Sequence, residues 1–526
     1  MHTTDCFGKT LKMVERAYPD PAQGWVDGAH LRREAHLATR PVRFGAEGIT
    51  LVARRFAEES EPLNGVADSI ARDTYYEGSF VRMPIEARDW HLAFEVAGAE
   101  RGQRLALVVN GEERARFDLA ARAVRRLEVT VPLTSRILEL GFVPADDLPG
   151  TEMSEKAAVV LRALEATAVE REPAPSPRIL IAGDSTVQTY FDEERPQSGW
   201  GEWLAWHLYR DHAATVANDP SSDAKQARVF TGTGPTVFNR SLGGRGFRTY
   251  LSEHRFDRLL GVMRPKDIVL IQFGLNDTSK ERPQRYIPLA SYAGWIDRYV
   301  ASVVDRGATP VLITPQPQYR APGREDGRSV FDDYADVLRS YAREHDVALI
   351  DLRAEAAAYL AEVPAENRSA YYLQADPFQY PSHPDGVRDN VHLSCLGAFV
   401  CAGIVARRLA ELMPGLDVEI EPQAEPVPVR GLTATSVRGN VGLETDLRWE
   451  PQGPDAYYVV KKLNAATGRV YRRAVSVQSR YLDLPLPGQA RDVVYTVTAW
   501  VAGHHADPVR IPCALPPDDD IVCDLS

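Results

Sequence analysis

The chain has 526 residues, of which 44% are hydrophobic and 25% are charged, and its formal net charge is −12. Domains usually contain ~100–200 residues, so about three domains are expected. The acidic balance argues against a nucleic-acid partner, which would need a basic face. No run approaches the ~18 apolar residues of a membrane span, so no membrane partner is expected either.

Cysteine use and the N-terminal residues bear on the compartment. The first residues lack the apolar core of a signal peptide. The five cysteines are scattered, odd in number and without CxxC or metal-ligand spacing, which favours reduced thiols. They are Cys6, Cys395, Cys401, Cys513 and Cys523. We therefore expect a cytoplasmic protein, or a secreted one if a native signal has been removed, and neither a metal nor an organic cofactor.

Residues 1–172 are expected to form an N-terminal β-sandwich. Short alternating or apolar runs include 90–96 and 104–109, and Asn110-Gly111 after the second run is a hairpin signal. Many short strands bounded by turns are typical of a sandwich. Such a domain could bind a glycan or only pack against its neighbour, and the sequence leaves both interpretations open.

Residues 178–415 follow a Pro-rich linker at 171–177 and alternate strands with helices. Continuous apolar runs are typical of parallel strands covered on both faces. They predict strands at 178–182, 268–273, 310–314 and 347–350. Helical patterns predict helices near 200–211, 253–263, 287–306, 329–345 and 395–412. This order of elements indicates an α/β domain built on a doubly wound parallel sheet.

A second linker, rich in Pro and Glu, spans residues 416–428 and precedes a β-rich region at 429–515. Short strand patterns there are spaced like a small sandwich. Trp449 in an early strand and Tyr495 in a late one resemble a fibronectin type III module. The chain is thus expected to be multidomain, with a central α/β domain flanked by two β-sandwiches.

The strand at 178–182 ends in Gly183-Asp184-Ser185-Thr186. Gly183 lets the chain turn sharply. Ser185 then lies at the carboxyl end of a strand, where open α/β sheets place their chemistry. The alternative is that Ser185 only caps the helix that follows. Asp184 is expected to hold the turn rather than to react.

Three later stretches contain groups that could act with Ser185. The Gly-rich turn around Gly244 can present backbone N–H groups to a developing negative charge, and Asn276 offers a side-chain amide after the most apolar strand. Asp389 and His392 are three residues apart, so the carboxylate can accept the imidazole Nδ1–H and leave Nε2 facing a serine. Each stretch taken alone also fits an ordinary turn.

In this order the four stretches resemble the SGNH (GDSL) hydrolase superfamily. Its blocks are matched by Gly183-Asp184-Ser185, Gly244, Gly274-x-Asn276-Asp277 and Asp389-x-x-His392. Longer matches at 183–187, 198–202, 239–245 and 380–392 are similar to the rhamnogalacturonan acetylesterase-like enzymes of carbohydrate esterase family 12. The N-terminal β-domain is similar to the galactose-binding-like domain that some of those enzymes carry. Two positions depart from the family, with Leu275 in place of its usual His and Val391 in place of its usual Thr.

The resemblance implies a serine esterase. Ser185 would attack the ester carbonyl, His392 would transfer the proton, and Asp389 would orient the imidazole. The backbone N–H groups of Ser185 and Gly244 and the side chain of Asn276 would form the oxyanion hole.

The resemblance further implies that the substrate carries O-acetyl groups on plant-polysaccharide-derived oligosaccharides, of the pectin or rhamnogalacturonan type or of the xylan type. Trp200, Arg245 and Tyr380 are the candidate substrate-binding residues. Arg245, Arg248 and Arg388 could meet an acidic sugar or be solvated structural arginines. Two alternatives stay open: an esterase or thioesterase of other small acyl substrates, and a glycan-binding scaffold with an inactive SGNH core. The sequence predicts no oligomeric state.

Overall fold

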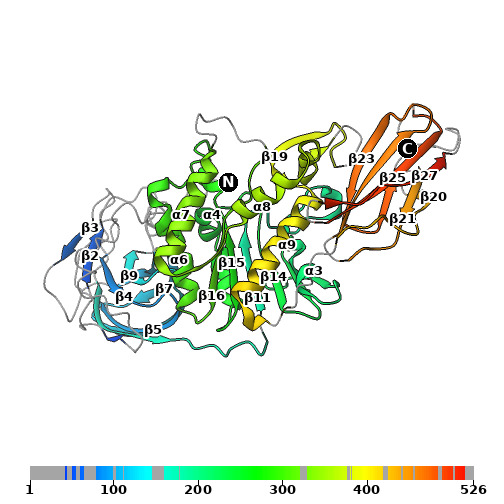
Figure 1. The fold of residues 1–526 in the computed structure, drawn as a ribbon. Helices are drawn as coiled ribbons and strands as arrows, with labels where there is room; N and C mark the ends of the chain where they lie inside the picture. Colours follow the sequence, from blue (N-terminus) through cyan, green and yellow to red (C-terminus); the bar gives the residue numbers. More distant parts are fainter. Residues whose placement is uncertain are drawn as a thin grey trace. The chain divides into compact units, whose positions relative to one another are not determined.

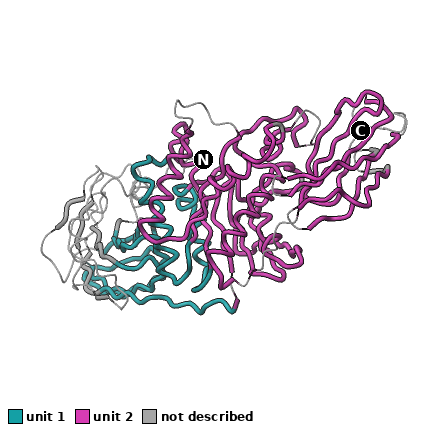
Figure 2. Tube along the Cα trace, viewed as in Figure 1, with its two compact units in different colours: residues 1–175, 247–267, 287–310 teal, residues 176–246, 268–286, 311–526 magenta. Residues whose placement is uncertain are grey.

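The computed structural model describes most of the chain from residue 79 onward and three short segments before it. The described residues are 42–43, 50–54, 60–63, 79–98, 102–110, 112–144, 159–176, 178–319, 328–375, 380, 382–416, 418, 425–439, 442–453, 456–483, 489–501 and 504–515. Cys6, Gly111, Cys523 and parts of both predicted linkers lie outside them. The chain divides into two compact units, coloured separately in Figure 2: residues 1–175, 247–267 and 287–310, and residues 176–246, 268–286 and 311–526.

Two antiparallel sheets make up most of the first unit. One has the strand order β1-β10-β5-β8 and the other β3-β2-β4-β9-β6-β7. The strands are β1 Val42–Arg43, β2 Thr50–Arg54, β3 Ser60–Leu63, β4 Ser79–Pro84, β5 Asp89–Gly98, β6 Gln103–Val109, β7 Glu112–Leu119, β8 Val124–Pro132, β9 Ile137–Pro144 and β10 Val159–Ala168. Alternate residues of a strand point to one face, and Trp90, Leu92 and Phe94 of β5 share a core with Leu138 and Leu140 of β9. The two sheets therefore pack face to face.

The hairpin predicted at Asn110 is confirmed, because β6 pairs antiparallel with β7 on either side of it. Asn110 has a φ of 46°, a value that asparagine adopts more readily than most residues. Its Nδ2 donates to the Ile137 carbonyl at 2.7 Å, and its Oδ1 accepts the Glu139 N–H at 2.7 Å. The turn is thereby tied to strand β9.

Three helices belong to the same unit: α4 (Phe247–Ser252), α5 (Arg255–Val262) and α6 (Leu289–Val304). The sequence predicts the second and third of them. Two ion pairs join the end of α6 to the strands. Arg306 Nη2 lies 2.7 Å from Asp89 Oδ1, and Arg136 Nη2 lies 2.6 Å from Asp305 Oδ1.

The second unit is built on a sheet with the order β12-β13-β14-β11-β15-β16-β17. Its strands are β11 Arg178–Gly183, β12 Thr215–Asn218, β13 Arg228–Thr231, β14 Thr236–Asn239, β15 Ile268–Gln272, β16 Thr309–Ile313 and β17 Ala348–Ile350. β11 is parallel to both of its neighbours, β14 and β15. Because β12, β13 and β14 pair antiparallel, the sheet is mixed, and the predicted parallel sheet is confirmed only in part. The turn between β13 and β14 is too short for the crossover that parallel pairing needs.

Apolar side chains cover both faces of the sheet, as the continuous apolar runs predict. On one face Ile179, Ile181 and Leu270 share a core with residues of α9, which lies across the sheet in Figure 1. On the other face Leu180 and Val269 have no exposed surface. The carboxyl ends of the parallel strands are thus held at one edge of a rigid layer, which is where Ser185 follows β11.

The remaining elements of this part are short 3-10 turns, two further strands and four helices. They are η2 Asp192–Glu194, η3 Trp200–Glu202, α3 Leu204–Leu208, η4 Asn276–Thr278, α7 Val330–His345, α8 Leu352–Glu362, η5 Ala365–Tyr371, β18 Tyr372–Ala375, β19 Val387–Leu393, α9 Cys395–Leu412 and η6 Pro414–Leu416. The predicted helix at 200–211 is broken into η3 and α3, and α8 was not predicted. Within the described ranges, no helix combines the length and the apolar content that crossing a membrane requires.

The C-terminal strands form two sheets in the second unit. One has the order β20-β21-β24 and the other β23-β22-β25-β26, with β27 paired to β25. Their bounds are β20 Thr433–Gly439, β21 Gly442–Arg448, β22 Tyr457–Asn464, β23 Val470–Ser476, β24 Arg480–Asp483, β25 Asp492–Val501, β26 His504–His505 and β27 Val509–Ala514. Trp449 and Tyr495 lie in the core that these sheets share. Tyr457 and Trp500 instead join the core around α9.

Candidate active site

The turn after β11 presents Ser185. A Cβ on Gly183 would lie 2.7 Å from Val187 Cγ2, so only glycine fits at the end of the strand. The Asp184 Oδ1 accepts both the Thr186 backbone N–H, at 2.9 Å, and the Thr186 hydroxyl, at 2.8 Å. Asp184 therefore holds the turn, as the sequence predicts.

Strand β19 carries Asp389 and His392. Ser185 Oγ lies 2.8 Å from His392 Nε2, and His392 Nδ1 lies 2.7 Å from Asp389 Oδ2. Asp389 Oδ1 also accepts the backbone N–H groups of Val391 and His392, at 2.8 and 2.9 Å. These bonds hold the carboxylate beside the imidazole. The result is a serine hydroxyl, an imidazole and a carboxylate in one hydrogen-bonded row, the arrangement that nucleophilic catalysis by serine needs.

The charges in this row stabilise a protonated imidazole. Burial alone would raise the pKa of Asp389, but its hydrogen bonds to the His392 ring and to backbone N–H groups lower that pKa to about 2. Burial opposes a charge on His392, but the hydrogen bond and charge of Asp389 outweigh it, so the pKa of His392 is raised above its usual value. An imidazole that gains a proton from Ser185 would therefore be stabilised.

Three donors are predicted to form the oxyanion hole. Among the described residues, the backbone N–H groups of Ser185 and Gly244 have no hydrogen-bond partner. Gly244 adopts a φ of 77°, which favours glycine. The neighbouring Gly243 N–H is taken by Gln188 Oε1 at 2.6 Å, which anchors the loop. Asn276 Nδ2 donates to the Arg245 carbonyl at 3.0 Å with one of its two N–H bonds, so the amide is oriented and one N–H bond stays available.

Asp277 links the loops that carry Gly244 and Asn276. Its carboxylate is buried and accepts the Gly274 N–H at 2.9 Å, where the chain has a φ of 124°. A Cβ on Gly246 would lie 2.4 Å from Asp277 Oδ1, so the Gly-rich loop can approach this carboxylate only as glycine. The second and third sequence blocks are therefore held against each other.

The prediction that Trp200 contacts substrate is wrong, because its side chain has no exposed surface. Its Nε1 donates to Gln272 Oε1 at 2.8 Å, and Gln272 Nε2 donates to Thr186 Oγ1 at 2.9 Å. Its neighbour Gly201 lies against the turn that carries Ser185, since a Cβ there would be 2.5 Å from the Val187 carbonyl. Trp200 thus stabilises the turn that carries Ser185, through its hydrogen bond to Gln272 and the bond from Gln272 to Thr186.

The other two predicted substrate contacts have different positions. Arg245 is partly buried and donates to the Gly243 carbonyl at 2.8 Å, next to Gly244, a predicted oxyanion donor. Tyr380 is partly exposed, and the His383 N–H donates to its carbonyl at 3.0 Å. Tyr380 lines a separate pocket that includes none of Ser185, Asp389 and His392. Of the two, only Arg245 adjoins the predicted catalytic groups.

Sequence comparison agrees with this geometry. Residues 181–398 match the model of the GDSL-like lipase/acylhydrolase family. The protein named "Probable rhamnogalacturonan acetylesterase YesY" from Bacillus subtilis (strain 168) is 33% identical over 237 residues, which cover 44% of this chain and 93% of that protein. The chain belongs to the GDSL hydrolase family. The predicted resemblance, and with it the prediction of an ester hydrolase, is confirmed.

Further relatives of this GDSL hydrolase carry similar names. Rhamnogalacturonan acetylesterase RhgT from Bacillus subtilis (strain 168) is 27% identical over 237 residues, 45% of this chain and 90% of that protein. A solved structure of Axe2, an acetylxylan esterase from Geobacillus stearothermophilus, is 17% identical, covers 48% of this chain and 98% of its own, and has a TM-score of 0.31. That structural likeness is too weak to carry an argument.

Several supporting residues of the GDSL hydrolase were not predicted. Gln188 and Gln272 hold the loop and the turn described above, and Gln316 Nε2 donates to the Val391 carbonyl in strand β19 at 3.1 Å. The sequence does indicate a structural role for Gln272, because it is a polar residue at the end of an otherwise apolar strand.

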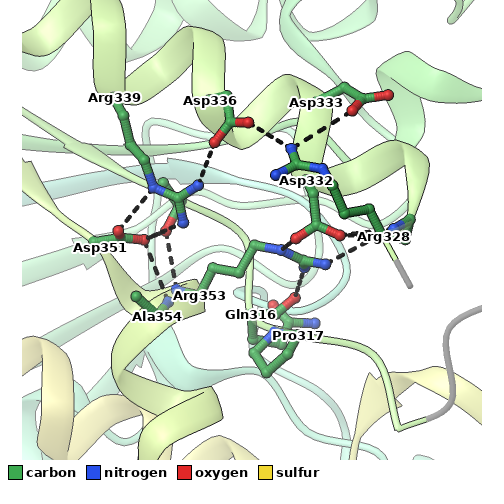
Figure 3. Close-up of polar contacts among 12 residues, drawn as sticks. Gln316, Pro317, Arg328, Asp332, Asp333, Asp336, Arg339, Asp351, Arg353 and Ala354 are labelled. Atoms are coloured by element: carbon green, nitrogen blue, oxygen red, sulfur yellow. Dashed lines mark hydrogen bonds and ion pairs between the residues drawn. The ribbon is translucent and has the colours of Figure 1, made fainter. Parts of the chain in front are cut away.

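Figure 3 shows a network of arginines and carboxylates next to Gln316. Arg353 Nη1 donates to the Gln316 carbonyl at 3.0 Å, and its Nε donates to Asp332 Oδ1 at 2.5 Å. Arg339 lies between Asp336 and Asp351, with an Nε–Oδ2 distance of 2.8 Å to Asp351. Arg353 holds the backbone of Gln316, and the Gln316 side chain binds the Val391 carbonyl of β19. The network therefore stabilises the segment that contacts β19.

Replacing Arg353 by methionine should destabilise the protein by ~2–4 kcal/mol. Arg353 is buried, so its removal would leave the Asp332 carboxylate without its cationic partner. Burial alone would raise the pKa of Asp332, but Arg353 and Ser329 lower it. Urea unfolding of the full chain should show a lower midpoint. Arg343→Met, at an exposed arginine of α7, is the matched control and should leave the midpoint unchanged. Equal midpoints for the two variants would contradict this role.

Replacing Asn276 by alanine should lower kcat for ester hydrolysis by ~10²–10³-fold with a smaller change in KM. The reason is that an oxyanion donor acts mainly in the transition state. Initial rates with 4-nitrophenyl acetate give both constants. Asn218→Ala, at an exposed position of β12, should behave as the wild type. A kcat for Asn276→Ala close to that of the control would show that Asn276 is not part of the oxyanion hole.

The pH at which kcat/KM falls on the acid side should depend on the charge of Asp184. Burial raises the pKa of Asp184 to about 6, and its charge contributes to the raised pKa of His392. Since His392 accepts a proton only when neutral, kcat/KM should fall as pH drops through its pKa. Asp184→Asn removes the charge and keeps an oxygen for Thr186, so this fall should move to lower pH. The exposed Asp346→Asn is the control, and the same pH dependence in all three proteins would refute this coupling.

Proposed function

We propose that the chain is a serine carbohydrate O-acetylesterase that removes O-acetyl groups from plant-polysaccharide-derived oligosaccharides, of the pectin or rhamnogalacturonan type or of the xylan type. The observation that carries the proposal is the row Ser185 Oγ–His392 Nε2–Asp389, with distances of 2.8 and 2.7 Å. The names of YesY and RhgT support the acetyl group and the pectin-type sugar.

The mechanism follows from the atoms in this row. His392 Nε2 takes the proton of Ser185 as Oγ attacks the acetyl carbonyl. The resulting oxyanion is received by the N–H groups of Ser185 and Gly244 and by Asn276. The imidazolium then gives its proton to the departing sugar oxygen and leaves an acetyl-Ser185. Water, activated by the same imidazole, releases acetate and restores the serine. Apart from this water and the substrate, the steps use only groups of this chain.

The substrate is tested by comparing acetate release from acetylated rhamnogalacturonan, acetylated xylan and peracetylated simple sugars. The proposal expects acetate from at least one of the polysaccharides, at a kcat/KM above that for 4-nitrophenyl acetate. A preference for long-chain 4-nitrophenyl esters or thioesters over all of them would favour the small-acyl alternative. Sugar binding without any acetate release would favour the inactive scaffold.

We also propose roles for the flanking regions. Residues 429–515 would form a fibronectin type III-like sandwich, supported by the shared core that holds Trp449 and Tyr495. Residues 1–172 would form a galactose-binding-like sandwich, supported by the two sheets packed on one core. We propose that the hydrolase domain spans residues 178–415, between the flanking domains at 1–172 and 429–515. We also propose that the protein is cytoplasmic and needs no cofactor. Fractionation of expressing cells tests the location.

A further inference from the structure

Arg285 reaches back to the loops that carry two of the predicted oxyanion donors. It follows tight turns after η4, in which the Arg282 N–H donates to the Ser279 carbonyl at 3.0 Å and the Arg285 N–H donates to the Arg282 carbonyl at 2.8 Å. The partly buried side chain of Arg285 then lies beside Asn276, and its Nη1 donates to Asn276 Oδ1 at 3.2 Å. Arg285 therefore holds a group that the proposed reaction uses.

The same guanidinium group lies against Gly244. A Cβ on Gly244 would be 2.9 Å from Arg285 Nη2 and 3.2 Å from Arg285 Cζ, so the group packs directly on the glycine backbone. Gly244 lies in the loop after β14, and Asn276 begins η4 after β15. These are the two strands that pair with β11, the strand that leads to Ser185. Arg285 thus bridges the two loops on either side of the Ser185 turn.

Two hydrogen bonds fix the direction in which the Asn276 amide faces. Its Oδ1 accepts from Arg285, and its Nδ2 donates to the Arg245 carbonyl at 3.0 Å. If the amide turned over, its N–H groups would face the guanidinium N–H groups and its oxygen would face a carbonyl, so both bonds would be lost. The direction matters for ester hydrolysis, because the amide nitrogen can donate to an oxyanion whereas the amide oxygen would repel it.

We propose that Arg285 is a positioning residue of the oxyanion hole. It acts through Asn276, because its guanidinium group holds the amide oxygen and so directs the second N–H bond of the amide to the place where the oxyanion develops. A donor that is already oriented needs no reorganisation during the reaction, which is the source of its effect on the rate. The planar guanidinium group suits this role, since its donors have a fixed geometry. The inference rests on the proposed esterase function.

Arg285→Met in the full-length protein tests this role, because methionine keeps a long unbranched side chain beside Gly244 and removes every donor. With 4-nitrophenyl acetate, kcat should fall ~10–100-fold, since a misplaced donor stabilises the transition state less. KM should change by less than ~3-fold, because the donor acts mainly in the transition state. Added to Asn276→Ala, the same substitution should lower kcat by less than ~3-fold, because the amide that Arg285 positions is gone. Arg282→Met, at an exposed arginine of the same loop, should match the wild type.

Two results would overturn the proposal while the wild-type protein stays active. One is a wild-type kcat for Arg285→Met. The other is an equal fold-loss with and without Asn276→Ala, because Arg285 would then act independently of the amide. If thermal unfolding shows that Arg285→Met does not fold, Arg285→Leu, which also lacks a donor, takes its place with the same expected coupling. A wild-type protein that hydrolyses no ester would instead refute the esterase function, and this role with it.

Discussion

Replacing Ser185 by alanine should lower kcat for 4-nitrophenyl acetate by ~10⁴–10⁶-fold. Ser185 Oγ lies 2.8 Å from His392 Nε2 and is the group placed to attack the carbonyl, so no acetyl-enzyme can form without it. The remaining oxyanion donors would still bind the ester, so KM should change far less than kcat. Initial rates at several substrate concentrations separate the two constants.

Ser252→Ala is the matched control, because Ser252 is exposed at the end of α4. It should retain the wild-type kcat. Similar rates for Ser185→Ala and Ser252→Ala would mean that the hydrolysis does not pass through Ser185, and the proposed mechanism would have to be abandoned.

Replacing His392 by alanine should have an effect of the same size, ~10⁴–10⁶-fold in kcat. The serine hydroxyl would lose its proton acceptor, and the charge of Asp389 would face no imidazole. Because Ser185 and His392 act as one unit, the double variant Ser185→Ala/His392→Ala should be hardly slower than either single variant. Rates of all three proteins with 4-nitrophenyl acetate test this.

His345→Ala provides the control, since His345 is an exposed residue at the end of α7. A His392→Ala protein that keeps more than about a tenth of the wild-type kcat would show that another group accepts the proton. If the double variant lost the product of the two single effects, the two residues would act independently, contrary to the hydrogen-bonded row.

The central sheet could largely be predicted because strands that are buried on both faces appear in the sequence as continuous apolar runs. β11, β15, β16 and β17 all lie within one residue of their predicted positions. The antiparallel strands were missed because they are four residues long, and β12 is exposed along its whole length. Helix α8 was missed because its sequence is rich in alanine and lacks an apolar stripe, although Asp351 before it caps its first turn.

Ser185, Gly244 and Asn276 could be placed together from sequence because each follows a strand whose end lies at one edge of the central sheet. Asp389 and His392 instead lie within β19, which pairs with β18, and their spacing in the sequence was the signal for them. What surrounds them could not be predicted. Trp200 was placed in the substrate cleft because an aromatic residue beside glycines looks the same in sequence whether it is exposed or buried. Gln272 and Thr186 are 86 residues apart, and no local pattern reports a hydrogen bond over that distance.

The central claim is that Ser185 is the nucleophile, and trapping tests it most directly. Diethyl 4-nitrophenyl phosphate should react with the wild-type protein, release one equivalent of 4-nitrophenol and abolish acetate release from 4-nitrophenyl acetate. Peptide mass spectrometry should then find the diethylphosphoryl group on Ser185 and on no other residue, and His392→Ala should label far more slowly. A label on a different residue, or full esterase activity with Ser185 labelled, would contradict the account.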